Sequence, residues 1–236
     1  MAHLVTHESD GTVATITMDD GKVNVLSLQM LMEVNAALDR AIADRQVVVL
    51  TGREGIFSAG FDLAVLRAGT YEAIEMLRAG FELAERLLAF PTPVVVAVPG
   101  HAIAMGLFLA LAGDFRVGAR GPFRLTANEV AIGMTLPHAA LEILRHGVAP
   151  SHFTRVALLA EPFTPDDAVI AGMLSTVVEP AAPRHGPDDG RRRGRARPRR
   201  ARRDQAPGAG GHAAGAPGGH RDRLLGSPAV GVARNG

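Results

Sequence analysis

FSAGFDL, residues 57–63, has the features of a junction between a strand and a helix. The β-branched run VVVLTG precedes it at residues 47–52, and the small residues Ser58, Ala59 and Gly60 predict a tight turn before a helix begins. Such a junction directs backbone N–H groups at a ligand, because the first N–H groups of a helix have no partner within it. One junction of this kind is common in α/β proteins, so a second signal is needed.

A second junction lies further along the chain. The run VVVAV at residues 94–98 is typical of a buried strand, and PGHAIAMG at residues 99–106 is expected to turn into an apolar helix at residues 107–112, with Asp114 after it. Two such units can each direct an N–H group at one point. The pair therefore predicts a site at which two backbone donors meet.

The other segments of the first 180 residues alternate strands and helices, as in a layered α/β fold. TVATITM at residues 12–18 alternates as a half-buried strand should. Ser27 is expected to cap a helix with an apolar stripe made of Leu28, Leu31, Leu38 and Ile42. TPDD at residues 164–167 predicts another helix start, with a threonine cap, proline at the first position and acids in the first turn, and this helix is expected to stop near Gly172.

Composition excludes several classes of site and location. Residues 1–180 are long and aliphatic enough to bury one core. The chain has no cysteine, which excludes disulfides and thiolate chemistry. A signal peptide or membrane span is not expected, so we expect a cytoplasmic protein. His101 and His138 lack acidic or thiol partners at ligand spacing, so no metal site is expected.

Residues 181–236 have a different composition. Residues 1–180 contain 12 Lys and Arg against 20 Asp and Glu, whereas residues 181–236 contain 13 against 4. Nine of the 13 residues at positions 191–203 are arginine. Because this segment has too little apolar surface to offset its ordering entropy, we predict a disordered tail at 181–236 after a domain at 1–180. Clustered arginine also favours salt-dependent, sequence-independent binding of nucleic acid.

Four motifs follow one another in a familiar order: GKVNVLS at residues 21–27, FSAGFDL, the segment at residues 100–116, and NEVAIG at residues 128–133. They resemble the crotonase family, the enoyl-CoA hydratases and isomerases, and the resemblance extends from about Asp19 to about Pro180. It implies a spiral of strand–strand–helix repeats, an acyl-CoA substrate, and a homotrimer or a dimer of trimers. Coenzyme A is then part of the substrate, and no separate cofactor is expected.

The resemblance also implies a backbone oxyanion hole. The N–H groups of Phe61 and Met105 would hold the thioester oxygen, and losing one such donor typically costs about 3–4 kcal/mol in barrier. The residues that it implies beside the substrate are Ala59, Gly60, Asp62, Leu63, Gly106 and Phe108.

Two features of these turns leave alternatives open. The family usually has glycines where this chain has Ala104 and Met105, so the Met105 side chain either points away from the thioester or narrows the pocket. Asp62 either favours a helix N-terminus or organises the pocket. For Asp114 we expect a structural role, satisfying backbone donors at the start of the next strand.

The number of glutamates in the expected site distinguishes hydration from isomerisation. Hydratases that the chain resembles use two glutamates, and here Phe108 occupies the first position and Glu129 the second. Hydration needs one group to activate water and another to protonate carbon, whereas a single base can shift a double bond. Glu129 as the base therefore favours 3,2-enoyl-CoA isomerisation, with 2-enoyl-CoA hydration and acyl-CoA binding without catalysis as alternatives. We expect Val130, Ala131 and Ile132 to raise the pKa of Glu129.

The tail has one more interpretation. Close crotonase relatives have Ala-Thr-Lys-Leu-Arg in a C-terminal helix. Codons for residues 203–207, RDQAP, together with the first base of the Gly208 codon, can encode that stretch when they are read one base later. We favour this frameshift interpretation over a genuine basic tail, and a gene without an insertion or deletion near codon 182 would contradict it. A lost C-terminus would leave apolar surface uncovered.

Overall fold

The computed structural model describes residues 3–180. The predicted tail at residues 181–236, with its disorder, its nucleic-acid binding and its frameshift interpretation, lies outside the described residues.

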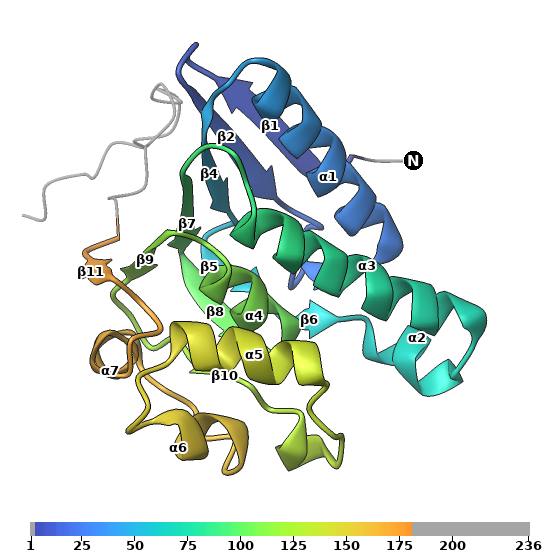
Figure 1. Ribbon diagram of the computed structural model, residues 1–236, viewed down its shortest axis with the longest axis vertical. Helices are drawn as coiled ribbons and strands as arrows, with labels where there is room; N and C mark the ends of the chain where they lie inside the picture. Colours follow the sequence, from blue (N-terminus) through green and yellow to red (C-terminus); the bar gives the residue numbers. More distant parts are fainter. Residues whose placement is uncertain (1–2, 181–236) are drawn as a thin grey trace, which may run out of the picture. The chain divides into compact units, whose positions relative to one another are not determined.

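The largest sheet has six strands in the order β1-β2-β4-β7-β9-β11 (Figure 1). Strands β1 and β2 pair antiparallel, and the other neighbours pair parallel. The strands are β1 (Val5–Ser9), β2 (Val13–Met18), β4 (Val47–Thr51), β7 (Val94–Val98), β9 (Phe115–Ala119) and β11 (Thr176–Val178).

Two small parallel sheets accompany the large one. The first has the order β10-β8-β5, and the second pairs β3 with β6. Their strands are β3 (Val25–Leu26), β5 (Gly55–Ser58), β6 (Gly60–Phe61), β8 (Gly100–Ile103) and β10 (Leu125–Thr126).

The helices pack against these strands. Helix α1 contacts β1, β2 and β4, α3 packs on α1 and α4, and α5 packs on α4 (Figure 1). The helices are α1 (Leu28–Ala43), α2 (Leu63–Ala68), α3 (Tyr71–Leu88), α4 (Met105–Leu111), α5 (His138–Gly147), α6 (Phe153–Ala157) and α7 (Pro165–Ile170), with a 3₁₀ turn η1 (Val130–Ile132).

The chain repeats one unit: a strand of the large sheet, a strand of a small sheet, then a helix. This order occurs in β2-β3-α1, in β4-β5-β6-α2, in β7-β8-α4 and, through η1, in β9-β10-α5. The α/β class and the expected strand–strand–helix repeats are therefore confirmed.

Local signals in the sequence explain several elements. In β2, Ala14, Ile16 and Met18 are fully buried and alternate with partly exposed residues, as period-two patterning requires. The Ser27 hydroxyl accepts a hydrogen bond from Met30 N (3.2 Å), which caps α1 as expected. Thr164 caps α7 in the same way, through Asp167 N at 3.2 Å.

The structure differs from the sequence-based expectations in one element boundary and in the apolar stripe of α1. Residues 99–106 were expected to form only a turn, but the four-residue strand β8 lies within them and α4 begins at Met105. Ile42, which the sequence placed near the apolar stripe of α1, is 39% exposed. The stripe is instead completed by Met30, Val34, Ala37 and Ala41, whose spacing keeps them on one face of the helix.

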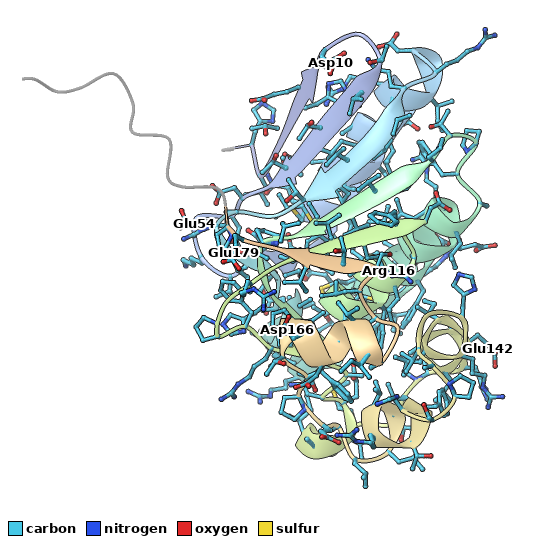
Figure 2. The ribbon with its side chains drawn as sticks, turned by 90° about the vertical axis from the view of Figure 1, so that its left-hand side faces the viewer. Asp10, Glu54, Arg116, Glu142, Asp166 and Glu179 are labelled. Atoms are coloured by element: carbon cyan, nitrogen blue, oxygen red, sulfur yellow. The ribbon has the colours of Figure 1, made fainter. Side chains whose placement is uncertain are left out.

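Arg116 lies between the large sheet and α7 (Figure 2). Its guanidinium donates to Gly113 O (3.0 Å), just past the end of α4, and to Gly172 O (3.3 Å), just past the end of α7. A cation is favourable at the carbonyl end of a helix, which carries partial negative charge. Arg116 therefore connects the end of α4 to α7.

Candidate active site

A mostly apolar cavity of ≈ 230 Å³ holds five of the nine predicted site residues. Its walls come from the first junction, from α2, α3 and α4, and from the segment at residues 128–137. The lining residues are Ala59, Phe61, Leu63, Leu66, Leu77, Phe81, Ala104, Phe108, Asn128, Glu129, Ile132, Met134, Thr135 and Pro137. Glu129 is the one ionisable side chain among these residues.

Glu129 follows β10 and begins the 3₁₀ turn η1. It is only 8% exposed, and within residues 3–180 its Oε2 atom has no hydrogen-bond partner and its carboxylate forms no ion pair. Burial raises the pKa of Glu129, because the charged form loses its solvation. A buried, unpaired carboxyl in a cavity is the usual environment of a catalytic acid or base.

The cause of the raised pKa differs from the expected one. Val130 and Ala131, next to Glu129 in the chain, are exposed, and Ile132 is 47% exposed although it lines the cavity. Burial of Glu129 must therefore come mainly from residues distant in the sequence, on the other walls of the cavity.

The two junctions are packed against each other. Gly60 adopts φ +87°, and a Cβ added there would lie 3.0 Å from Ala104 Cβ and 3.3 Å from Met105 N. A Cβ added at Gly106 would lie 2.5 Å from Ser58 O. Each glycine thus sits where the other junction approaches too closely for a side chain. The structure brings together the two turns that the sequence singled out.

The backbone N–H of Met105 is available at the start of α4, whereas the next N–H groups that follow Gly106 are already used. The N–H groups of Leu107 and Phe108 donate to Ala104 O (2.9 and 3.2 Å). Met105 is the first residue of α4, so its N–H has no acceptor within the helix. In the other junction, Phe61 ends β6, opposite Leu26, and its side chain lines the cavity.

A hydrogen-bond network that the sequence did not reveal fixes the first junction. Ser58 Oγ accepts from Gly60 N (3.1 Å) and donates to Asn24 O (2.7 Å). The Asn24 amide in turn donates to Met18 O (2.9 Å) and Phe57 O (3.2 Å). Both side chains are fully buried, so these bonds hold β6, which ends with Phe61, in place.

Met105 and Ala104 resolve the alternative about the missing glycines. The Met105 side chain is 1% exposed, and its Cε lies 3.7 Å from the position of a Cβ added to Gly80 on α3, so it is packed in the core and does not line the cavity. Ala104 does line the cavity, and it adopts φ +51° and ψ −124°. For a residue with a Cβ, a sparsely populated backbone conformation of this kind costs about 1–3 kcal/mol.

Asp62 and Asp114 have structural roles. Asp62 caps α2 by accepting from Ala64 N (2.8 Å) and Val65 N (3.4 Å), and it is absent from the cavity walls, which favours the helix-terminus interpretation. Asp114 accepts from Val94 N (2.7 Å) at the start of β7. The donor therefore belongs to the preceding strand of the large sheet rather than to the next one.

Aromatic rings form one wall of the cavity. Phe108 stacks on Phe81 with ring centroids 6.4 Å apart, and Phe81 meets Phe61 edge-on at 6.3 Å. Phe108 is 1% exposed and offers no group that could bind or orient water. Leu77 and Phe81 were not predicted as site residues, although their four-residue spacing on α3 is a recognisable apolar stripe.

Metal binding and membrane spanning were also considered for the side chains and helices of residues 3–180. This part of the chain has no cluster of three or more His, Asp or Glu residues that could hold a metal. The His101 ring accepts a hydrogen bond from Arg124 N at 3.1 Å. None of the helices in this part is both long and apolar enough to cross a membrane.

The sequence and the fold are similar to those of known proteins. The family model described as Enoyl-CoA hydratase/isomerase matches residues 8–183. A probable enoyl-CoA hydratase of Rhodobacter capsulatus is 31% identical over 174 residues, which cover 73% of this chain and 67% of the relative. The chain spans 66% of the length of other curated relatives, such as a probable enoyl-CoA hydratase of Bacillus subtilis.

Solved structures agree with this match. The enoyl-CoA hydratase EchA3 of Mycobacterium ulcerans superposes with a TM-score of 0.73 and 47% identity, covering 75% of this chain and 78% of that one. An enoyl-CoA isomerase of Mycobacterium tuberculosis gives a TM-score of 0.73 and 46% identity, covering 76% and 79%. On the family match and these relatives, the chain belongs to the enoyl-CoA hydratase/isomerase family.

Proposed function

We propose that this chain is a 3,2-enoyl-CoA isomerase in which Glu129 is the base. The observation that carries the proposal concerns Glu129 and Phe108. Glu129 has a buried carboxyl whose Oε2 atom has no hydrogen-bond partner within residues 3–180, and it lies with Phe108 in a cavity that has no second ionisable group among its described lining residues. This combination suits a reaction that moves one proton and involves no water.

The thioester oxygen would bind to the N–H groups of Phe61 and Met105. Two donors in a cavity with little water stabilise an oxyanion strongly, because they are already oriented and the local dielectric constant is low. The network through Ser58 and Asn24 supports this role, since it restrains the backbone next to Phe61. The acyl chain would then lie against the aromatic wall.

The reaction balances with one carboxyl. Glu129, as the carboxylate, removes a proton from C2 of a 3-enoyl-CoA, and the electrons of that C–H bond move to form a dienolate with its charge on the thioester oxygen. The protonated Glu129 then returns the proton to C4, while the C=C bond moves from C3–C4 to C2–C3. A raised pKa helps both steps, because it brings the carboxyl closer to the working pH.

Hydration of a 2-enoyl-CoA is the second candidate. The names of the curated relatives favour it, since these relatives are called probable enoyl-CoA hydratases. Against it stands the buried phenyl ring of Phe108, which cannot activate a water molecule. Acyl-CoA binding without catalysis is a third possibility with no specific observation in its favour.

The deciding experiment incubates the full-length protein with a 3-enoyl-CoA and follows product mass and the absorbance of the conjugated thioester together. We expect conjugation at constant mass. A product heavier by one water would support hydration, and saturable binding without either change would support a silent binder. A 2-enoyl-CoA incubated in parallel gives the matched test, since an isomerase should not increase its mass.

The expected homotrimer or dimer of trimers and the expected cytoplasmic location belong to the same proposal. Light scattering on the full-length chain tests the first, and fractionation of cells that express it tests the second. A monomer in solution would remove the oligomer from the proposal without affecting the isomerase reaction.

A further inference from the structure

Ala104 has a backbone conformation suited to glycine at the edge of the cavity. Within residues 3–180, four residues other than glycine have positive φ: Asn24, Arg45, Ala104 and Ala160. Ala104 alone among these four lines the cavity. Strained backbone persists where the surroundings hold it in place, and it is found often at ligand-binding sites.

The backbone of Ala104 is held on both sides. Its N–H donates to Thr126 O (2.8 Å) on β10, and its carbonyl accepts from Leu107 N (2.9 Å) and Phe108 N (3.2 Å). Its methyl carbon also lies 3.0 Å from the position that a Cβ on Gly60 would take. The methyl group therefore has a fixed place and cannot move aside for a ligand.

That place borders the reacting end of the proposed substrate. Ala104 immediately precedes Met105, whose N–H is one proposed donor to the thioester oxygen, and its wall of the cavity continues to Phe108. A carbonyl oxygen about 3 Å from Met105 N brings C1 and C2 of the acyl group next to the Ala104 methyl. Added bulk on C2 would have to occupy the same space.

We propose that the Ala104 methyl group is a specificity determinant that restricts this site to acyl-CoA substrates without a substituent on C2. The inference rests on the proposed function, and it adds a substrate class: acyl chains that are unbranched next to the thioester. It requires no group beyond those in the cavity.

The test compares a linear 3-enoyl-CoA with its 2-methyl analogue in the wild type, in Ala104→Gly and in Ala160→Gly. An extra methyl group in a tight apolar pocket changes kcat/KM by about 10- to 200-fold, so we expect the wild type to prefer the linear substrate by that factor. Ala104→Gly should narrow the preference at least about tenfold by raising kcat/KM for the branched substrate.

Ala160→Gly is the matched control. Ala160 has φ +50° and is 9% exposed, but it does not line the cavity. Relief of strain alone should therefore leave the substrate preference unchanged. Equal use of both substrates by the wild type, or an unchanged preference in Ala104→Gly, would overturn the inference.

A binding measurement separates this inference from the proposed reaction. Dissociation constants are measured for a linear saturated acyl-CoA and its 2-methyl analogue, neither of which can isomerise. If turnover is absent but the linear thioester binds at least tenfold more tightly in the wild type and not in Ala104→Gly, the isomerase proposal fails and the steric inference stands. Equal affinities for the two thioesters in the wild type would overturn the inference whatever the turnover.

Discussion

Gly60 in the first junction and Ala104 in the second both adopt positive φ, at +87° and +51°. In the first junction a glycine takes this conformation without strain, but it has no room for a side chain, because the second junction lies 3.0 Å from its missing Cβ. In the second junction an alanine has a positive φ at a cost of about 1–3 kcal/mol. The choice of residue at position 60 is thus limited by space, and at position 104 it is limited by backbone conformation.

This difference shows that the two junctions are positioned by separate means. Packing of the glycines at 60 and 106 brings the junctions together, whereas hydrogen bonds around Ala104 hold a strained residue in place. Substitutions that fill space should therefore harm both junctions at once, and substitutions that relieve strain should act locally.

The largest effect is expected when the proposed base is removed. In the proposal both junctions only donate hydrogen bonds, and Glu129 alone moves the proton. Glu129→Gln should lower kcat by about 10²–10⁴-fold, the usual contribution of a general base, and leave acyl-CoA affinity within a few-fold. Rates with a 3-enoyl-CoA and a titration with a saturated acyl-CoA measure the two quantities. Glu142→Gln, at an exposed position on α5 (Figure 2), is the control. Turnover that survives Glu129→Gln would assign the proton transfer to another group.

The next effect tests whether packing joins the junctions. In Gly106→Ala the new methyl group would meet the Ser58 carbonyl oxygen at 2.5 Å, and backbone cannot yield as a side chain can. We expect kcat/KM to fall about 100-fold, since a shift of about 1 Å in a catalytic group has that effect. Gly118→Ala is the control, because its methyl group would meet the end of the Leu174 side chain instead. Equal losses in the two variants would mean that general destabilisation explains the result.

Gly60→Ala makes the first junction resemble the second. It adds positive-φ strain and a contact with Ala104, and we expect unfolding free energy to fall by about 1–2 kcal/mol and kcat/KM to fall about tenfold. Gly11→Ala separates the two causes, because Gly11 has φ +97° with no atom within 4 Å of its missing Cβ. If Gly11→Ala loses as much stability and no activity, strain explains the stability change and contact explains the activity change.

Ser58→Ala weakens the first junction without adding volume. It removes the acceptor of Gly60 N and the donor to Asn24 O, which leaves two buried polar groups unpaired at about 1–3 kcal/mol of stability. We expect a several-fold fall in kcat with KM nearly unchanged, because Phe61 N would be positioned less well. Ser175→Ala, which removes the acceptor of Arg116 N (3.1 Å), is the control. A fall in kcat that is equal in both variants would remove Ser58 from this role.

The smallest effect concerns the carboxyl that faces both junctions. Because burial raises the pKa of Glu129 in the folded state, its contribution to stability is present below the unfolded pKa and is lost as pH rises through the folded pKa. Denaturant unfolding of wild type and Glu129→Gln from pH 4 upward should show the wild type losing stability relative to the variant. A difference that does not change with pH would mean that burial does not raise this pKa.

Much of the fold could be predicted where one segment contains its own signal. The alternation in β2 and the caps Ser27 and Thr164 depend on residues a few positions apart, and each was confirmed. Strand β8 was not foreseen from its residues, because four residues containing glycine and histidine become a strand only through pairing with β5 and β10.

The residues of the site also divide into those that a local motif predicts and those that depend on packing between distant segments. FSAGFDL and NEVAIG placed Phe61, Leu63 and Glu129 on the cavity, because each motif is a single short turn. Phe81 and the burial of Glu129 depend on packing between segments far apart in the sequence, which no local pattern specifies. The positive φ of Ala104 could have been suspected from the family's glycine at that position.

The shielding of Glu129 has a stereochemical consequence. In the proposed isomerase reaction, a single carboxyl fixed on one wall of the cavity would reach only one face of a flat dienolate. The hydrogen that leaves C2 and the hydrogen that arrives at C4 would then lie on the same side of the molecule. Because Glu129 is only 8% exposed, we expect its carboxyl to exchange a proton with the solvent more slowly than an exposed carboxyl would. Deuterium placed at C2 would then be carried in part to C4 within the same substrate molecule, even in ordinary water.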